Sequence, residues 1–122
     1  MTISYPASRV MSAASAVYGV YALLRPAHLA DAMHADADQR GSYDTLARAY
    51  GVRDLAISAV GVFGPPRAVR WAMGARIAGD LADCATLLAR ADEGAIRGKV
   101  VGVTLGWAAL NAAALRWDEA RH

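Results

Sequence analysis

The chain has 122 residues, which is enough for one packed domain and too few for two. Hydrophobic residues make up 56% of the chain and charged residues only 20%, a composition that favours a membrane protein over a soluble helical one. The net charge of +2 is spread over every segment without an aromatic and basic stripe, which argues against nucleic acid as a partner.

Long helical segments follow one another along the chain, and no segment alternates with the period of a strand. The first helix is expected over about 8–25, where two arginines bracket an uncharged run, and we interpret it as a retained helix rather than a cleaved signal peptide. Pro26 ends it. A polar loop with at most one helical turn then extends to Ser42, the expected N-cap of the second helix.

The other three helices are separated by short turns. The second is expected over about 43–63, because a glycine and two prolines at 64–66 stop it, and the last of these prolines can start the third helix. The third covers about 67–91, and a turn at residues 92–94 leads to the fourth at about 95–117. The predicted fold is therefore all-α, a four-helix transmembrane bundle forming one domain over residues 1–122.

A soluble bundle is the alternative, since the second and third helices carry charged residues around an alanine-rich core. The first and fourth helices lack the charged outer face that a soluble surface helix needs. We therefore expect an integral, multi-pass protein of the cell membrane with the lipid bilayer as its partner. Counts of basic residues on the two sides are tied, so its orientation is not predicted.

Small residues at four-residue spacing predict where helices approach closely, because a helix without bulky side chains on one face can come nearer to its neighbour. The same faces also allow association into a homo-oligomer. These residues are Gly98, Gly102 and Gly106 in the fourth helix, and the pairs Ser12 with Ala16 and Ser15 with Gly19 in the first.

Charged residues inside the predicted apolar layer are the most informative feature. Each costs about 2.5–3.5 kcal/mol even on a mild insertion scale, so each needs a partner or water. Arg76 and Asp80 share one face of the third helix, which predicts a pair, whereas Arg53 and Asp54 point about 100° apart and are expected to serve different partners. Three cations and three anions make up the set: Arg48, Arg53, Arg76, Asp54, Asp80 and Asp83.

Two interpretations of this cluster stay open. In the structural one, the charges form cross-helix salt bridges without chemistry, and the protein is a noncatalytic membrane module that binds a lipid or a partner protein. In the functional one, they line a cavity where a carboxylic acid assists isomerisation or cyclisation of a lipophilic small molecule. The candidate catalytic residues are then Asp80, Asp54 and Asp83, and the candidate substrate-binding residues are Arg53, Arg76, Tyr18, Tyr50, Trp107 and Asn111.

No cofactor or metal is expected. The chain contains no glycine-rich phosphate loop, nucleophile elbow or zinc-protease motif. His28, Asp31 and His34 recur every third residue, a spacing that does not bring all three to one face of a helix. Cys84 is predicted to be a small buried hydrophobic residue.

Two stretches carry a resemblance to a known group of proteins. They are LARAYGVRDLAISAVGVFG in the second helix and RWAMGARIAGDLADCATLLARA in the third. They resemble the small four-helix integral membrane proteins of bacteria that form a family of unknown function, over roughly residues 8–117. The shared features are a G-x-R-D-L motif, here Gly51, Arg53, Asp54 and Leu55, and then Arg76, Asp80 and Asp83. The resemblance implies a membrane fold and implies no activity.

Overall fold

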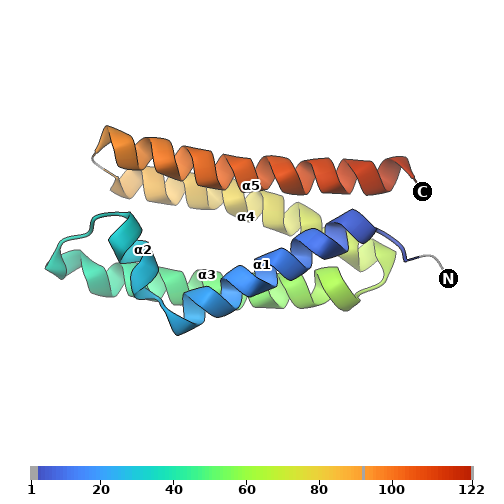
Figure 1. The fold of residues 1–122 in the computed structure, drawn as a ribbon, viewed down its shortest axis with the longest axis horizontal. Coiled ribbons are helices and arrows are strands. Elements are labelled where there is room, and N and C mark those ends of the chain that lie inside the picture. Colours follow the sequence, from blue (N-terminus) through green and yellow to red (C-terminus); the bar gives the residue numbers. More distant parts are fainter. Residues whose placement is uncertain (1–2, 92, 122) are drawn as a thin grey trace.

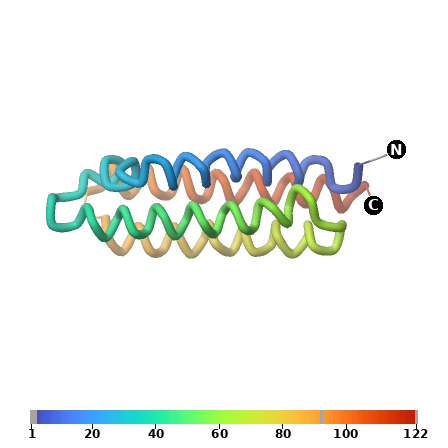
Figure 2. Tube along the Cα trace, turned by 90° about the horizontal axis from the view of Figure 1, so that it is seen from below, coloured from blue at the N-terminus to red at the C-terminus, as the bar shows by residue number. Residues whose placement is uncertain are grey.

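The computed structural model describes residues 3–91 and 93–121, and this part of the chain is mostly helical and has no strand. The predicted all-α class is confirmed. Four long helices run alternately up and down, so both termini lie at the same end (Figures 1 and 2). The long helices are α1 (Pro6–Leu24), α3 (Ala37–Phe63), α4 (Pro66–Arg90) and α5 (Gly94–Ala120).

A fifth, short helix differs from the expected loop. It is α2 (Ala27–Ala32), and the next helix begins at Ala37 after Asp36 rather than after Ser42. The predicted N-cap at Ser42 is therefore wrong, because Gly41 and Ser42 lie inside α3. One glycine in a helix costs about 1 kcal/mol, which the rest of this long helix overcomes.

The other helix ends fall close to the expected positions. Gly64 ends α3 and Pro66 is the first residue of α4, as its fixed φ angle favours. Gly94, expected in a turn, is the first residue of α5, which extends three residues past the predicted end. Asp92, also predicted in that turn, lies outside the described residues.

The closest packing is between α1 and α3. Small residues line the buried face of α1, and the backbones approach so closely at Gly19 and Gly51 that a Cβ on Gly51 would lie 2.9 Å from the Gly19 carbonyl oxygen. The predicted small-residue face of the first helix is thus confirmed for Ser12, Ser15 and Gly19, which are all buried.

The corresponding prediction for the last helix is wrong within this chain. Gly98, Gly102 and Gly106 face open space, and a Cβ added to any of them would meet no neighbouring atom within 4 Å. The inward face of α5 is offset by two residues from these glycines. It carries Ile96, Val100, Thr104, Ala108 and Asn111. Two residues correspond to about 200° around a helix, so the glycines occupy the opposite face.

Both ends of the bundle are closed by specific contacts. At the terminal end, the buried carboxylate of Asp118 accepts hydrogen bonds from the backbone N–H groups of Ala7 (3.1 Å) and Ser8 (2.6 Å) at the start of α1. At the other end α2 folds over an apolar cluster formed by Leu29, Ala30, Met33, Tyr43, Ala47, Cys84, Leu87, Ala91, Ile96 and Val100. Cys84 is buried as predicted.

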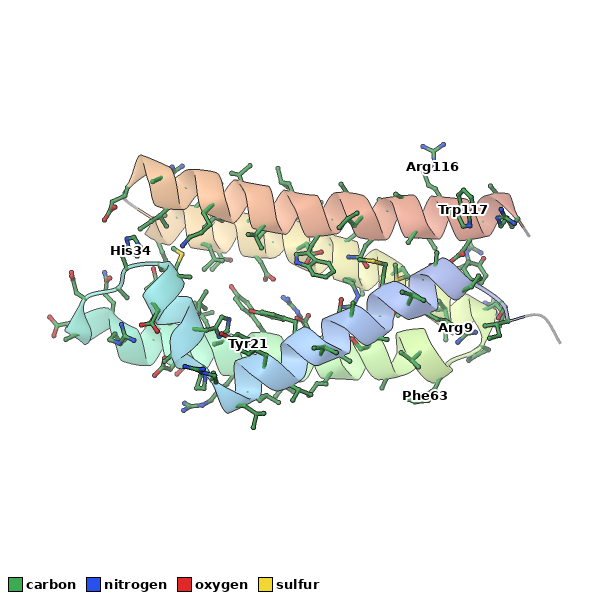
Figure 3. All side chains as sticks on the ribbon, viewed as in Figure 1. Arg9, Tyr21, His34, Phe63, Arg116 and Trp117 are labelled. Atoms are coloured by element: carbon green, nitrogen blue, oxygen red, sulfur yellow. The ribbon has the colours of Figure 1, made fainter. Side chains whose placement is uncertain are left out.

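The outer surface carries a wide uncharged band. No exposed charged residue occurs in 10–24 of α1, 49–63 of α3, 71–89 of α4 or 101–115 of α5. Large apolar side chains point outward there, and Phe63, which Figure 3 shows projecting from the bundle, is 86% exposed. Of the helices in the described ranges, α5 alone is long and apolar enough by itself to cross a membrane.

Candidate functional site

A cavity of about 220 Å³ lies inside the bundle and is lined by residues from all five helices. Nitrogen- and oxygen-bearing side chains project into the space between the two helix pairs (Figure 3). The nine residues that the sequence nominated all line this cavity: Asp80, Asp54, Asp83, Arg53, Arg76, Tyr18, Tyr50, Trp107 and Asn111. The structure thus brings them together, and their chemical roles stay predictions.

Arg53 of α3 is fully engaged by carboxylates. Its Nη1 and Nη2 donate to the two oxygens of Asp83 on α4, at 2.8 and 2.7 Å. Nη2 also lies 3.4 Å from Asp54 Oδ1, so these neighbours interact, contrary to the expectation that they serve different partners. The guanidinium carbon sits 5.0 Å from the centre of the Tyr50 ring. A bidentate pair of this kind fixes α3 against α4.

Arg76 of α4 has a different environment. It is 4% exposed, and its Nη2 donates to Ser58 Oγ on α3 at 2.9 Å, while its Nε has no hydrogen-bond partner. The predicted pair with Asp80 is not formed, since no carboxylate of the described residues lies within salt-bridge distance of Arg76. Sharing a helix face did not suffice, because the Arg76 side chain reaches across to α3.

Asp80 is the one carboxylate of the cluster left without a partner among the described residues. It forms neither a salt bridge nor a hydrogen bond there, and its Oδ2 is buried. Asp54 and Asp83 both lie against Arg53. The three carboxylates look equivalent in the sequence, but in the structure two of them contact the Arg53 guanidinium and Asp80 does not.

Further unpartnered polar atoms belong to the same lining. Tyr50 OH and Asn111 Oδ1 are buried without a hydrogen-bond partner, although the Asn111 Nδ2 donates to the Trp107 carbonyl at 2.8 Å. A buried polar atom left unsatisfied costs about 1–3 kcal/mol. Together with Arg76 Nε and Asp80 Oδ2, four such atoms belong to residues that line this cavity.

Apolar side chains form the rest of the lining. They come from α2, the end of α4 and the first half of α5: Leu29, Ala32, Met33, Leu87, Val100 and Val103. Sequence reasoning placed α2 in a polar loop and so missed its contribution. The signal was available in the apolar residues Leu29 and Met33, which lie four apart as on one helix face.

His28 is a second residue that sequence reasoning did not assign to the cavity. Its Nδ1 lies 2.8 Å from the Arg25 carbonyl and must donate there, so the neutral ring accepts at Nε2 from Tyr18 OH, 3.1 Å away. This bond fixes the Tyr18 side chain at the cavity wall. Asp31 instead pairs with Arg40 at 2.5 Å, and the described residues contain no cluster suited to a metal ion.

Arg48 does not belong to the cluster. The structure places Arg48 on the exposed face of α3, directly before the uncharged range 49–63. The prediction that Arg48 lies inside the apolar layer is therefore wrong. Its position follows from the helix period, since Arg48 is five residues from Arg53 and the two point about 140° apart.

No protein-family model, curated protein or solved structure matches the chain. The function is therefore inferred from the residues of the cavity.

Proposed function

We propose that this protein is a transmembrane bundle that binds a lipophilic small molecule in its central cavity and assists its isomerisation or cyclisation, with Asp80 as the general acid. The observation that carries the proposal is a carboxyl group without a partner among the described residues, in a cavity that also holds a buried arginine and is lined largely by apolar and aromatic side chains.

The uncharged band supports the membrane assignment. It covers 15 to 19 residues of each long helix, which at 1.5 Å per residue corresponds to about 22–28 Å, close to the roughly 30 Å of a bilayer core. Arginines follow at both ends of the band, where their stems can reach the interfaces. Charges in α3 and α4 lower the hydropathy of these helices although they point inward. Association of copies through the outward face of Gly98, Gly102 and Gly106 is part of this proposal.

The acid step assigns separate roles to the charged residues. Asp80 gives its proton to a double bond of the substrate, and the guanidinium of Arg76 stabilises the carboxylate that remains. The same carboxylate takes a proton back from a neighbouring carbon, so the net change is a shifted double bond or a closed ring. Arg53, Asp54 and Asp83 hold α3 against α4 and shape the cavity, while the aromatic rings of Tyr18, Tyr50 and Trp107 face the substrate.

The bidentate contact of Arg53 with Asp83 favours one alternative, because a cross-helix pair of this geometry serves a structural network equally well. In that case the protein is a noncatalytic membrane module, and the cavity holds a lipid or supports contact with a partner protein.

The test uses pseudoionone, a neutral polyene ketone that cyclises to ionones under acid catalysis. We expect the purified protein in detergent to form ionones, measured by gas chromatography. Asp80→Asn keeps the size of the side chain but cannot donate a carboxylic proton, so it should lose conversion while its melting temperature holds. Asp83→Asn should instead lower the melting temperature because it weakens the contact with Arg53, and the exposed Asp38→Asn serves as the control.

Two results would decide against this proposal. Full conversion by Asp80→Asn would exclude Asp80 as the acid. If the unmodified protein forms no more ionone than detergent alone, the noncatalytic module takes the place of the enzyme.

A further inference from the structure

The charges around the cavity restrict the kind of ligand it accepts. The covered cations of the described lining, Arg53 and Arg76, match the ionised carboxylates of Asp54 and Asp83, while Asp80 is protonated as its acid role requires and Lys99 is exposed. Because these formal charges balance, an anionic or cationic ligand would bring an uncompensated charge into a mostly apolar space, which is costly. A neutral ligand does not have this cost.

The hydrogen-bonding capacity left in the cavity restricts the ligand further. Arg76 Nε can only donate, whereas the Asn111 Oδ1 can only accept. The protonated carboxyl of Asp80 accepts through one oxygen and donates through the other, and Tyr50 OH can do either. Arg53 and Asp83 already bind each other through two hydrogen bonds. The ligand's polar part must therefore carry both an acceptor and a donor.

The size of the cavity sets a third limit. Its 220 Å³ lies below the roughly 300–1,000 Å³ usual for sites that hold drug-sized ligands. The apolar side chains Leu29, Met33, Leu87, Val100 and Val103 supply most of the remaining wall. A compact hydrocarbon body of about two fused rings, or a short chain of similar volume, suits this space.

We infer that the cavity selects a neutral hydroxy-ketone, a compact lipophilic molecule whose carbonyl accepts from Arg76 and whose hydroxyl donates to Asp80 or Asn111. This inference rests on the proposed function, because it names the substrate class of the same cavity. It excludes fatty-acid anions, phosphorylated lipids and amines as the preferred ligand.

Four probes of nearly the same shape test the inference. They are 4-hydroxy-1-tetralone with acceptor and donor, 1-tetralone with the acceptor alone, tetralin with neither, and the anion of tetralin-1-carboxylic acid. Binding is followed by the change in the emission of Trp107, in intensity and wavelength, in the detergent-solubilised Trp71→Phe, Trp117→Phe protein. Trp71 and Trp117 are 77% and 57% exposed and do not line the cavity.

The expected order of affinity is 4-hydroxy-1-tetralone, then 1-tetralone, then tetralin, with about fivefold for each hydrogen-bonding group, and the carboxylate weakest of the polar probes. Tyr50→Phe removes a hydroxyl without a partner in the protein, so it should fold normally and weaken binding of the hydroxy-ketone more than that of tetralin.

Equal affinity for tetralin and the hydroxy-ketone, or tightest binding of the carboxylate, would overturn the ligand class and leave the acid role of Asp80 to the pseudoionone assay. If no probe changes the emission of Trp107, the cavity is not a ligand site, and both the inference and the proposed function fail.

Discussion

The contact between α1 and α3 predicts opposite effects for two glycine-to-alanine substitutions. In Gly51→Ala the new methyl group would lie 2.9 Å from both the Gly19 carbonyl oxygen and Leu23 Cγ. The optimal carbon contact is about 3.5 Å or more, so α1 must move by roughly 0.6 Å. Overpacking of this kind costs about 1–3 kcal/mol.

The matched control is Gly41→Ala, an exposed position of the same helix where a Cβ meets nothing within 4 Å. Alanine favours a helix over glycine by about 1 kcal/mol at both positions. The free energy of unfolding should therefore be lower for Gly51→Ala than for Gly41→Ala by about 1–3 kcal/mol. Thermal melting in one detergent, followed by circular dichroism, should separate the two midpoints by several degrees.

The order of the two melting temperatures tests whether α1 and α3 pack as closely as described. If Gly51→Ala melts at or above the temperature of Gly41→Ala, α1 and α3 do not approach through Gly19 and Gly51, and the packing of the bundle as described is wrong.

Two further predictions concern the charged cluster and the outer surface. Arg53→Gln should lower the free energy of unfolding by about 2–3 kcal/mol, because Asp83 loses its bidentate partner in a half-buried setting. The control Arg48→Gln, on the exposed face, should change the free energy of unfolding by less than about 0.5 kcal/mol. Equal effects of the two substitutions would mean that the Arg53 contact contributes no stability. The uncharged outer band predicts that the protein stays in the membrane fraction through a sodium carbonate wash and needs detergent to leave it. Recovery in the aqueous fraction after the wash would contradict the membrane assignment.

Much of the fold was predictable because strong local signals mark it. Proline and glycine at 64–66 separate α3 from α4 at the expected place, and uncharged runs locate α1 and α5. The start of α3 was missed, since Gly41 and Ser42 look like a helix boundary but lie inside a helix stabilised by its later turns. Local propensity is weak compared with tertiary packing.

The sequence was sufficient to predict which charged residues line the cavity, but not which acid pairs with which arginine. Charged residues in apolar helices must face inward, which suffices to nominate Arg53, Asp54, Arg76, Asp80 and Asp83. Which acid meets which arginine depends on the distance and rotation between α3 and α4, and spacing along one helix does not encode them. For this reason the expected contact of Arg76 with Asp80 failed, and Arg53 instead takes Asp83.

Labelling by dicyclohexylcarbodiimide tests most directly whether Asp80 is an unengaged acid in an apolar cavity. This lipophilic reagent modifies carboxylic acids that are reachable from an apolar phase, and mass spectrometry of peptides locates the adduct. We expect modification of Asp80 ahead of Asp54 and Asp83, which Arg53 holds, and slower modification when 4-hydroxy-1-tetralone is present. Preferential labelling of Asp54 or Asp83, or no labelling in the cavity at all, would contradict it.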